Sequence, residues 1–328
     1  MKRRAWIQTG LGLGLLAQWP AQATQRLTWQ TTTFTGLGTT LSIRAAHADP
    51  KVLERALALA RHSVARVEDQ MSLFRSNSAI QQLNRDGVLR NPPPDLLRVL
   101  QIGQRISAQS RGAFDVTVQP LWALYAEAQT RGGLPTAADI QSARQRVGWR
   151  HLQISPERVS FAKPGMRITL NGIAQGYASD LVREQLQRSG ISHALINTGE
   201  WSSLGKADQG RDWMLGIADP HQADHFITRL RMTRGCVATS ADDQCSFSAD
   251  RAHHHILDPE TGYSPRDISS VTVVAKTCTE ADALTKVLFV GGYENALHIA
   301  SARHVDALVV HKDGRWKATH SLSQHLFA

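Results

Sequence analysis

The segment spanning residues 168–190, ITLNGIAQGYASDLVREQLQRSG, constrains the fold most, because it predicts a short buried strand, a glycine turn and an amphipathic helix. Ile168 and Leu170 alternate with a polar residue, the apolar residues that follow recur at helical spacing, and Gly190 is the expected C-cap. Such a unit directs backbone N–H groups and the positive end of a helix at one point, which favours phosphate binding. An ordinary strand-to-helix turn remains an alternative, because neither GxGxxG nor GxxxxGKS/T is present.

Composition and charge exclude several classes of protein. The 328 residues are enough for one large domain or two moderate ones. Beyond the N-terminus no long apolar run indicates a bundle of membrane spans. The net charge of +9 comes from scattered Lys and Arg residues, without a basic block interleaved with aromatic residues. This pattern argues against nucleic-acid binding, and a basic surface suits an anionic small molecule.

Residues 1–23 have the layout of a signal peptide, with a basic start, a short apolar stretch and an A-x-A cleavage site that ends at Ala23. Arg3-Arg4 resembles a twin-arginine signal. We therefore expect residues 24–328 to form a single domain that is exported to the periplasm by the twin-arginine route. An uncleaved anchor is the alternative, although the apolar run is short for a membrane span.

The three cysteines, Cys236, Cys245 and Cys278, leave at least one thiol without a partner in the same chain. Cys236 and Cys245 could form a disulfide across a turn, and three separate thiols are an equally good interpretation. No CxxC pair is present, which excludes a zinc ribbon.

Hydrophobic periodicity predicts an α+β fold, with mixed or antiparallel sheet layers packed with helices. Asp49 and Pro50 provide an N-cap and a first helical residue for a long helix. The predicted helices cover residues 52–70, 79–85, 95–110, 137–147, 177–189, 280–290 and 295–300. The predicted strands cover residues 41–44, 152–154, 159–161, 168–170, 193–197, 213–217, 227–232, 236–239, 268–274 and 307–310.

Asp115 is the first candidate functional residue. It lies in the segment 112–125, GAFDVTVQPLWALY, where apolar residues alternate up to Val118 and Pro120 begins a helix. A carboxylate between large apolar neighbours needs a partner. Asp115 is therefore either a site residue or a structural cap.

The second conspicuous segment is HHHILDPETGYSP, residues 253–265, a polar loop. Three consecutive histidines cannot direct all their rings at one point, so we favour a single functional histidine over a three-histidine zinc site. A His-rich metal-binding protein is the alternative that rests on these residues alone.

Six ordered segments resemble the ApbE family, the FAD:protein FMN transferases, over nearly the whole chain after the predicted signal peptide. These segments are LGT at 37–39, MSLF at 71–74 with LN at 83–84, GAFDVT at 112–117, NGIAQGYASD at 171–180, HILDP at 255–259 and ADAL at 281–284. The resemblance implies the α+β fold of these flavin transferases. It also implies that FMN is transferred from FAD to a Thr or Ser hydroxyl of an acceptor flavoprotein through a phosphoester bond, with release of AMP and with Mg²⁺ as cofactor. Membrane contact would come only through a membrane-bound acceptor.

The resemblance also assigns site residues. Mg²⁺ is expected at the backbone carbonyl of Ala174 and the carboxylate of Asp282, since Mg²⁺ prefers oxygen ligands. His255 is expected to be the base or the group that orients the phosphate. The residues expected to contact FAD are Leu37, Phe74, Ala113, Phe114, Asp115, Thr169, Gln175 and Asp258.

Six positions depart from the family pattern. Thr169 stands where the family has Asp, Asn171 where it has Gly, and Gln175 where it has Lys. Thr198 stands where the family has Leu, Glu200 where it has Gly, and Lys286 where it has a metal-ligating Thr. These changes concern one proposed site. They fit either a transferase with an altered site, or an FAD pyrophosphatase or a non-catalytic periplasmic flavin-binding protein.

Overall fold

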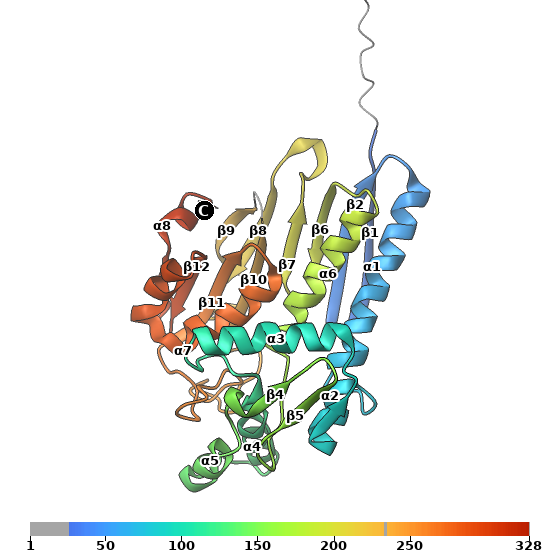
Figure 1. The fold of residues 1–328 in the computed structure, drawn as a ribbon. Coiled ribbons are helices and arrows are strands. Elements are labelled where there is room, and N and C mark those ends of the chain that lie inside the picture. The colour runs from blue at the N-terminus through green and yellow to red at the C-terminus, as the bar shows by residue number, and fades with distance from the viewer. Residues whose placement is uncertain (1–25, 233–234, 328) are drawn as a thin grey trace, which may run out of the picture.

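The computed structural model describes residues 26–232 and 235–327 (Figure 1). Its centre is an eight-stranded sheet in which all neighbouring strands are antiparallel. In spatial order the strands are β1 (Thr28–Gly36), β2 (Thr39–His47), β6 (His193–Asn197), β7 (Trp201–Leu204), β10 (Cys236–Ala241), β11 (Ile268–Ala275), β12 (Asp306–His311) and β13 (Trp316–Ala318). The predicted signal peptide lies outside the described residues.

Three helices cover one face of this sheet: α1 (Pro50–Met71), α6 (Ala174–Arg188) and α7 (Cys278–Ala302) (Figure 1). The N-terminus of α1 is as predicted, because the Asp49 carboxylate accepts the N–H of Lys51. Apolar residues of α7 and of β11 share one buried cluster, so this helix is held against the sheet by hydrophobic packing.

The other face packs against a three-stranded sheet, β14 (Leu326–Phe327), β9 (Phe226–Met232) and β8 (Trp213–Ala218). Apolar residues of β8 and β9 form a buried cluster against the large sheet, and the short helix α8 (His320–Ser323) adds Leu322 to this cluster. Along β12 successive side chains alternate between the two faces. Leu308 and Val310 join this cluster, and Val309 joins the cluster on the helical face.

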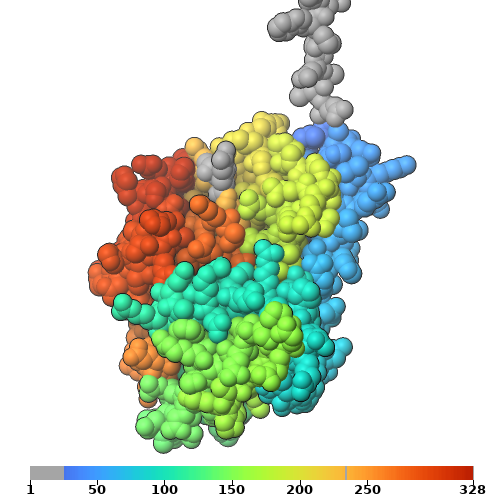
Figure 2. All heavy atoms as spheres, viewed as in Figure 1, coloured from blue at the N-terminus to red at the C-terminus, as the bar shows by residue number. Residues whose placement is uncertain are grey.

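A second part of the molecule lies below the ends of the sheet strands, and α3 crosses the boundary (Figure 1). In the space-filling view, side chains fill the space between α3 and the helices above it on this face (Figure 2). The elements of this part are α2 (Ala79–Asp86), β3 (Val88–Arg90), α3 (Pro94–Gln109), α4 (Gln119–Thr130), α5 (Ala137–Arg144), β4 (Leu152–Ile154) and β5 (Arg158–Phe161). The predicted α+β class is thus confirmed. None of the helices in the described ranges combines the length and the apolar character that a membrane crossing requires.

The strand predicted at residues 168–170 is wrong, because this extended segment pairs with no strand of the described sheets. Its apolar residues are buried as expected. The side-chain amide of Asn84, however, accepts the Ile168 N–H at 2.7 Å and donates to the Ile168 carbonyl at 2.9 Å. The Thr169 N–H donates to the Val116 carbonyl at 2.8 Å. One side chain and one loop therefore satisfy the backbone groups that a partner strand would otherwise bind.

Two further patterns differ from the structure in detail. The alternating residues up to Val118 do not form a strand, since residues Val116–Val118 are a 3-10 turn that the Asp115 carboxylate caps through the Thr117 N–H. The two helices predicted at 280–290 and 295–300 are one element, α7, which breaks at Gly292, where φ is 77°.

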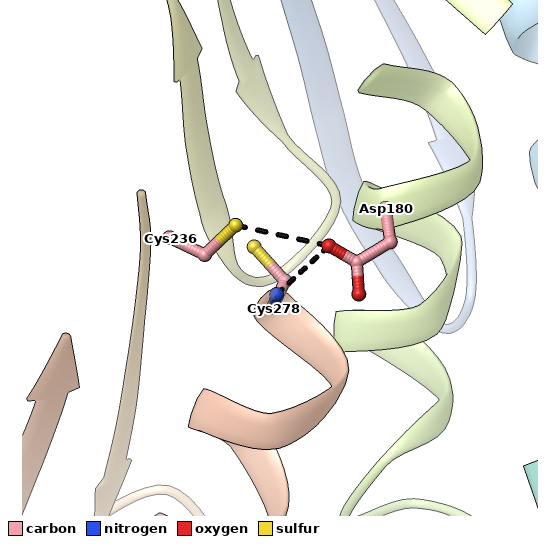
Figure 3. A group of neighbouring side chains, drawn as sticks. All are labelled: Asp180, Cys236 and Cys278. Atoms are coloured by element: carbon pink, nitrogen blue, oxygen red, sulfur yellow. Dashed lines mark hydrogen bonds between the residues drawn. The ribbon is translucent and has the colours of Figure 1, made fainter. Parts of the chain in front are cut away.

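Helices α6 and α7 cap each other. Asp180 of α6 accepts the N–H of Cys278, the first residue of α7, at 2.8 Å (Figure 3). It also accepts the N–H of Thr279, the second residue of α7, at 2.9 Å. In return, Asp282 of α7 accepts the Gly176 N–H in the first turn of α6 at 3.1 Å. Each carboxylate thus lies at the positive end of the other helix and satisfies N–H groups that have no partner within their own helix.

Cys236 and Cys278 lie beside Asp180 and form with it the one group of metal-capable side chains found in the described part of the chain (Figure 3). Both Asp180 oxygens already accept N–H groups of α7, so the helix cap accounts for this carboxylate. The three cysteines are free thiols, and Cys236 approaches the α6–α7 junction. The structure therefore matches the alternative of three separate thiols.

The loop at 253–265 is anchored by His254, which is fully buried. Its Nε2–H donates to the Pro265 carbonyl at 3.1 Å, and its Nδ1 accepts the Ile256 N–H at 3.3 Å. Its ring also packs edge-on against Phe289 of α7. Burial lowers the pKa of His254 to about 4, and a proton on Nδ1 would face an N–H group instead of an acceptor.

The contact between α6 and α7 predicts that Gly176→Ala destabilises the protein. A Cβ there would lie 2.3 Å from the Cys278 carbonyl oxygen and 2.9 Å from Asp282 Cβ. Because backbone is in the way, we expect the free energy of unfolding to fall by about 1–3 kcal/mol in denaturant titrations. Gly133→Ala is the control, since nothing lies within 4 Å of its Cβ position. Equal stability of the two variants would contradict the close contact.

The neutral state of His254 predicts a pH dependence of stability. The pKa of His254 is about 4 when folded, and a free histidine has a pKa of about 6.5, so the unfolded chain binds the extra proton between these values. The free energy of unfolding should therefore fall by up to roughly 3 kcal/mol as the pH drops from about 6.5 to about 4. His254→Gln should flatten this slope in urea titrations across the range, whereas His62→Gln, on the exposed side of α1, should not. If the free energy of unfolding of the unchanged chain, His254→Gln and His62→Gln fell with pH at the same slope, the neutral buried state of His254 would be contradicted.

Candidate functional site

A pocket lies where the lower part of the molecule meets the sheet and α7. Four stretches of chain line it: the loop 113–118, the segment 169–175 that leads into the first residues of α6, the end of β10 with the residues that follow it, and the loop 255–259. Glu200, Lys286 and Trp122 complete the lining. Gln175, the second residue of α6, is one of the lining residues, so the first turn of this helix borders the pocket.

Six of the residues predicted to form the site line this pocket. They are Ala113, Phe114, Asp115, Thr169, Gln175 and His255. They come from segments far apart in the sequence, and the fold brings them to one pocket.

Three other predicted contacts do not line it. Leu37 lies in the turn between β1 and β2, where its N–H donates to Glu68. Phe74 is 81% exposed and borders a neighbouring hollow that shares Trp122 with the pocket. Asp258 accepts the Glu260 N–H and the Thr261 hydroxyl, both 2.9 Å away, and so holds its own loop together.

Asp115 is both a structural cap and a part of the pocket wall. Its Oδ1 accepts the N–H and the hydroxyl of Thr117 at 2.8 and 2.7 Å, and its Oδ2 accepts the Trp149 N–H at 2.8 Å. Burial raises the pKa of this carboxyl, and the hydrogen bonds oppose that rise. Asp115 therefore fixes the shape of the loop 113–118 while its side chain borders the pocket.

The three consecutive histidines have three different surroundings. His253 lies beside the Tyr125 ring, with centroids 6.0 Å apart, and His254 is the buried anchor of the loop. His255 lines the pocket, and its Nδ1 lies 3.1 Å from the Cys245 carbonyl oxygen. Because a carbonyl only accepts, Nδ1 carries the proton and Nε2 is left as an acceptor. Burial lowers the pKa of His255, which favours this neutral form.

Asp282 is 1% exposed, and Lys286 shields it from the pocket. The Lys286 Nζ lies 2.5 Å from Oδ1 of Asp282 and 3.1 Å from its backbone carbonyl oxygen. The second carboxylate oxygen, Oδ2, accepts the Gly176 N–H. Thr285, next to Lys286, turns away and bonds to the Ser240 hydroxyl at 2.7 Å.

This arrangement does not fit the divalent cation expected at Ala174 and Asp282. Both oxygens of the carboxylate have partners, and one of these partners is itself a cation. Mg²⁺ binds carboxylate oxygens at about 2.1 Å, which would bring it against the Lys286 ammonium. Ala174, the first residue of α6, is buried and is not among the residues that line the pocket.

Glu200 is a pocket residue that the motif comparison identified only as a departure. It is 5% exposed, and its Oε2 accepts the Thr239 N–H at 3.1 Å. Burial, together with the Asp282 carboxylate, raises the pKa of Glu200 well above its ordinary value, and Lys286 acts in the opposite direction. The preceding residue, Gly199, has no side chain, which leaves room for the Gln175 amide.

Comparison with known proteins agrees with the fold. The family description "ApbE family" matches residues 37–309. An FAD:protein FMN transferase of Vibrio cholerae is 30% identical over 84% of this chain and 85% of its own length, and one of Salmonella typhimurium is 27% identical over 74% and 73%. The crystal structure of the apo flavinyl transferase ApbE of Pseudomonas stutzeri superposes with a TM-score of 0.80 at 28% identity, covering 91% of this chain and 97% of that one. The chain therefore belongs to the ApbE family.

Proposed function

We propose that the chain transfers FMN from FAD to a Thr or Ser hydroxyl of an acceptor flavoprotein and releases AMP. The observation that carries this proposal is His255, a half-buried neutral histidine whose Nε2 is left as an acceptor. It lines the same pocket as the Lys286 ammonium and the turn before α6. A base and a cation in one pocket are groups that promote phosphoryl transfer to a hydroxyl.

In the proposed reaction, Nε2 of His255 accepts the proton of the acceptor hydroxyl. The hydroxyl oxygen forms a bond to the phosphorus of the FMN half, and the pyrophosphate P–O bond to AMP breaks. AMP leaves with the electron pair of that bond. The Gln175 side-chain amide lines the pocket at the first turn of α6, where it can donate to the phosphate oxygens.

The resemblance also implies Mg²⁺. Because Lys286 engages the carboxylate expected to hold this ion, we assign no step to Mg²⁺ at Asp282. We further propose that the chain acts after export to the periplasm, on an acceptor that is either free or bound to the membrane. This second proposal rests on the layout of residues 1–23 and on the family's acceptors.

The role of His255 predicts that His255→Ala loses transfer. The full chain would be incubated with FAD, Mg²⁺ and a flavin-free acceptor domain with a suitable Thr, and the mass of the acceptor would be followed over time. Loss of a general base typically slows a reaction by about 10²–10⁴-fold, so we expect labelling to slow at least a hundredfold.

His253→Ala is the matched control, because it removes the neighbouring ring without touching the pocket lining. This control should label the acceptor at close to the original rate, and circular dichroism would establish that both variants fold. Labelling by His255→Ala at the rate of the unchanged chain would rule out the base. AMP and free FMN with an unlabelled acceptor would favour an FAD pyrophosphatase.

A further inference from the structure

The side chain of Lys286 is held in place before any ligand arrives. It lies one helical turn after Asp282 on α7, which places the two side chains on the same face of the helix. Two of its three ammonium hydrogens have acceptors, Oδ1 and the backbone oxygen of Asp282. The Lys286 side chain is 20% exposed and lines the pocket. One N–H group therefore remains for a ligand.

The aliphatic stem of Lys286 is also packed. A Cβ at Gly172 would lie 3.1 Å from Cε and 3.5 Å from Cδ of this lysine, and 3.5 Å from the Phe114 ring. The absence of a side chain at Gly172 thus leaves room for the stem of Lys286. The stem therefore packs against the turn before α6, with its ammonium at Asp282.

The surrounding charges suit a single positive charge. Asp282 contributes one buried carboxylate, and the Lys286 ammonium already contacts it. A second, doubly charged ion would have to enter next to the ammonium at a distance where the two cations repel strongly. The site as built holds one cation, and that cation is part of the chain.

We propose that Lys286 is the resident cation of this site: its ammonium replaces a divalent ion at Asp282 and donates directly to the pyrophosphate of FAD. The inference rests on the proposed function for the identity of the ligand. An ammonium is a compact point charge that binds phosphate well. FAD should consequently bind without a divalent cation, and the carboxylate of Asp282 should not recruit one.

Two measurements on the full chain test this inference. Electron paramagnetic resonance with Mn²⁺ reports binding of a divalent ion directly, with and without FAD. Calorimetric titration of FAD in EDTA and in Mg²⁺ reports how far flavin binding depends on a metal. The unchanged chain should bind no stoichiometric Mn²⁺, and its Kd for FAD should agree within about twofold in the two buffers.

Lys286→Thr removes the ammonium and offers a hydroxyl in its place. In EDTA its affinity for FAD should fall at least about tenfold, because a charge-assisted hydrogen bond is lost. It should also bind one Mn²⁺ and regain FAD affinity in Mg²⁺. Lys276→Thr removes an exposed lysine outside the pocket and should behave as the unchanged chain in both measurements.

Stoichiometric Mn²⁺ binding by the unchanged chain, or a tenfold loss of FAD affinity in EDTA, would overturn the inference. Both results are independent of whether any variant folds. Metal-independent FAD binding without acceptor labelling would sustain the role of Lys286 and refute the transferase proposal. No FAD binding in either buffer would refute the contact with pyrophosphate together with the proposed function.

Discussion

The structure depends on the way helices α6 and α7 hold each other. Each supplies a carboxylate, Asp180 or Asp282, to the N-terminal N–H groups of the other. The helices approach so closely at Gly176 that a methyl group would not fit. Because Asp282 is buried, its charge must be balanced, and in this chain Lys286 does so. The same contact sets the turn before α6, which forms one wall of the pocket.

Local patterns predicted most of the secondary structure. Asp49 and Pro50 mark the start of α1, and Gly190 follows α6 with φ at 82°, because caps depend only on nearby residues. The segment 168–170 could not be predicted in this way. Its alternation is that of a strand, but its backbone partners are the Asn84 side chain and the Val116 carbonyl. Contacts across such separations in sequence are invisible to periodicity.

The candidate site was predicted through motifs, and six of the residues that the motifs name line one pocket in the structure. The same comparison placed Leu37, Phe74 and Asp258 in the site, whereas here they support a turn, border a neighbouring hollow and stabilise a loop. A motif fixes which residues occur in order, and the fold determines which side chains face the pocket. Glu200 and Lys286 were visible in the sequence only as departures. That Lys286 pairs with the Asp282 carboxylate and that Glu200 lines the same pocket could be learned only from the structure.

The most direct test of FMN transfer to a protein hydroxyl is a product balance for the full chain supplied with FAD and a flavin-free acceptor. Mass spectrometry counts FMN-bearing acceptor, and chromatography counts AMP, free FMN and remaining FAD in the same sample. The account predicts equal amounts of AMP and FMN-bearing acceptor, with little free FMN. AMP matched only by free FMN, or FAD that stays intact throughout, would contradict the transfer of FMN to a protein hydroxyl.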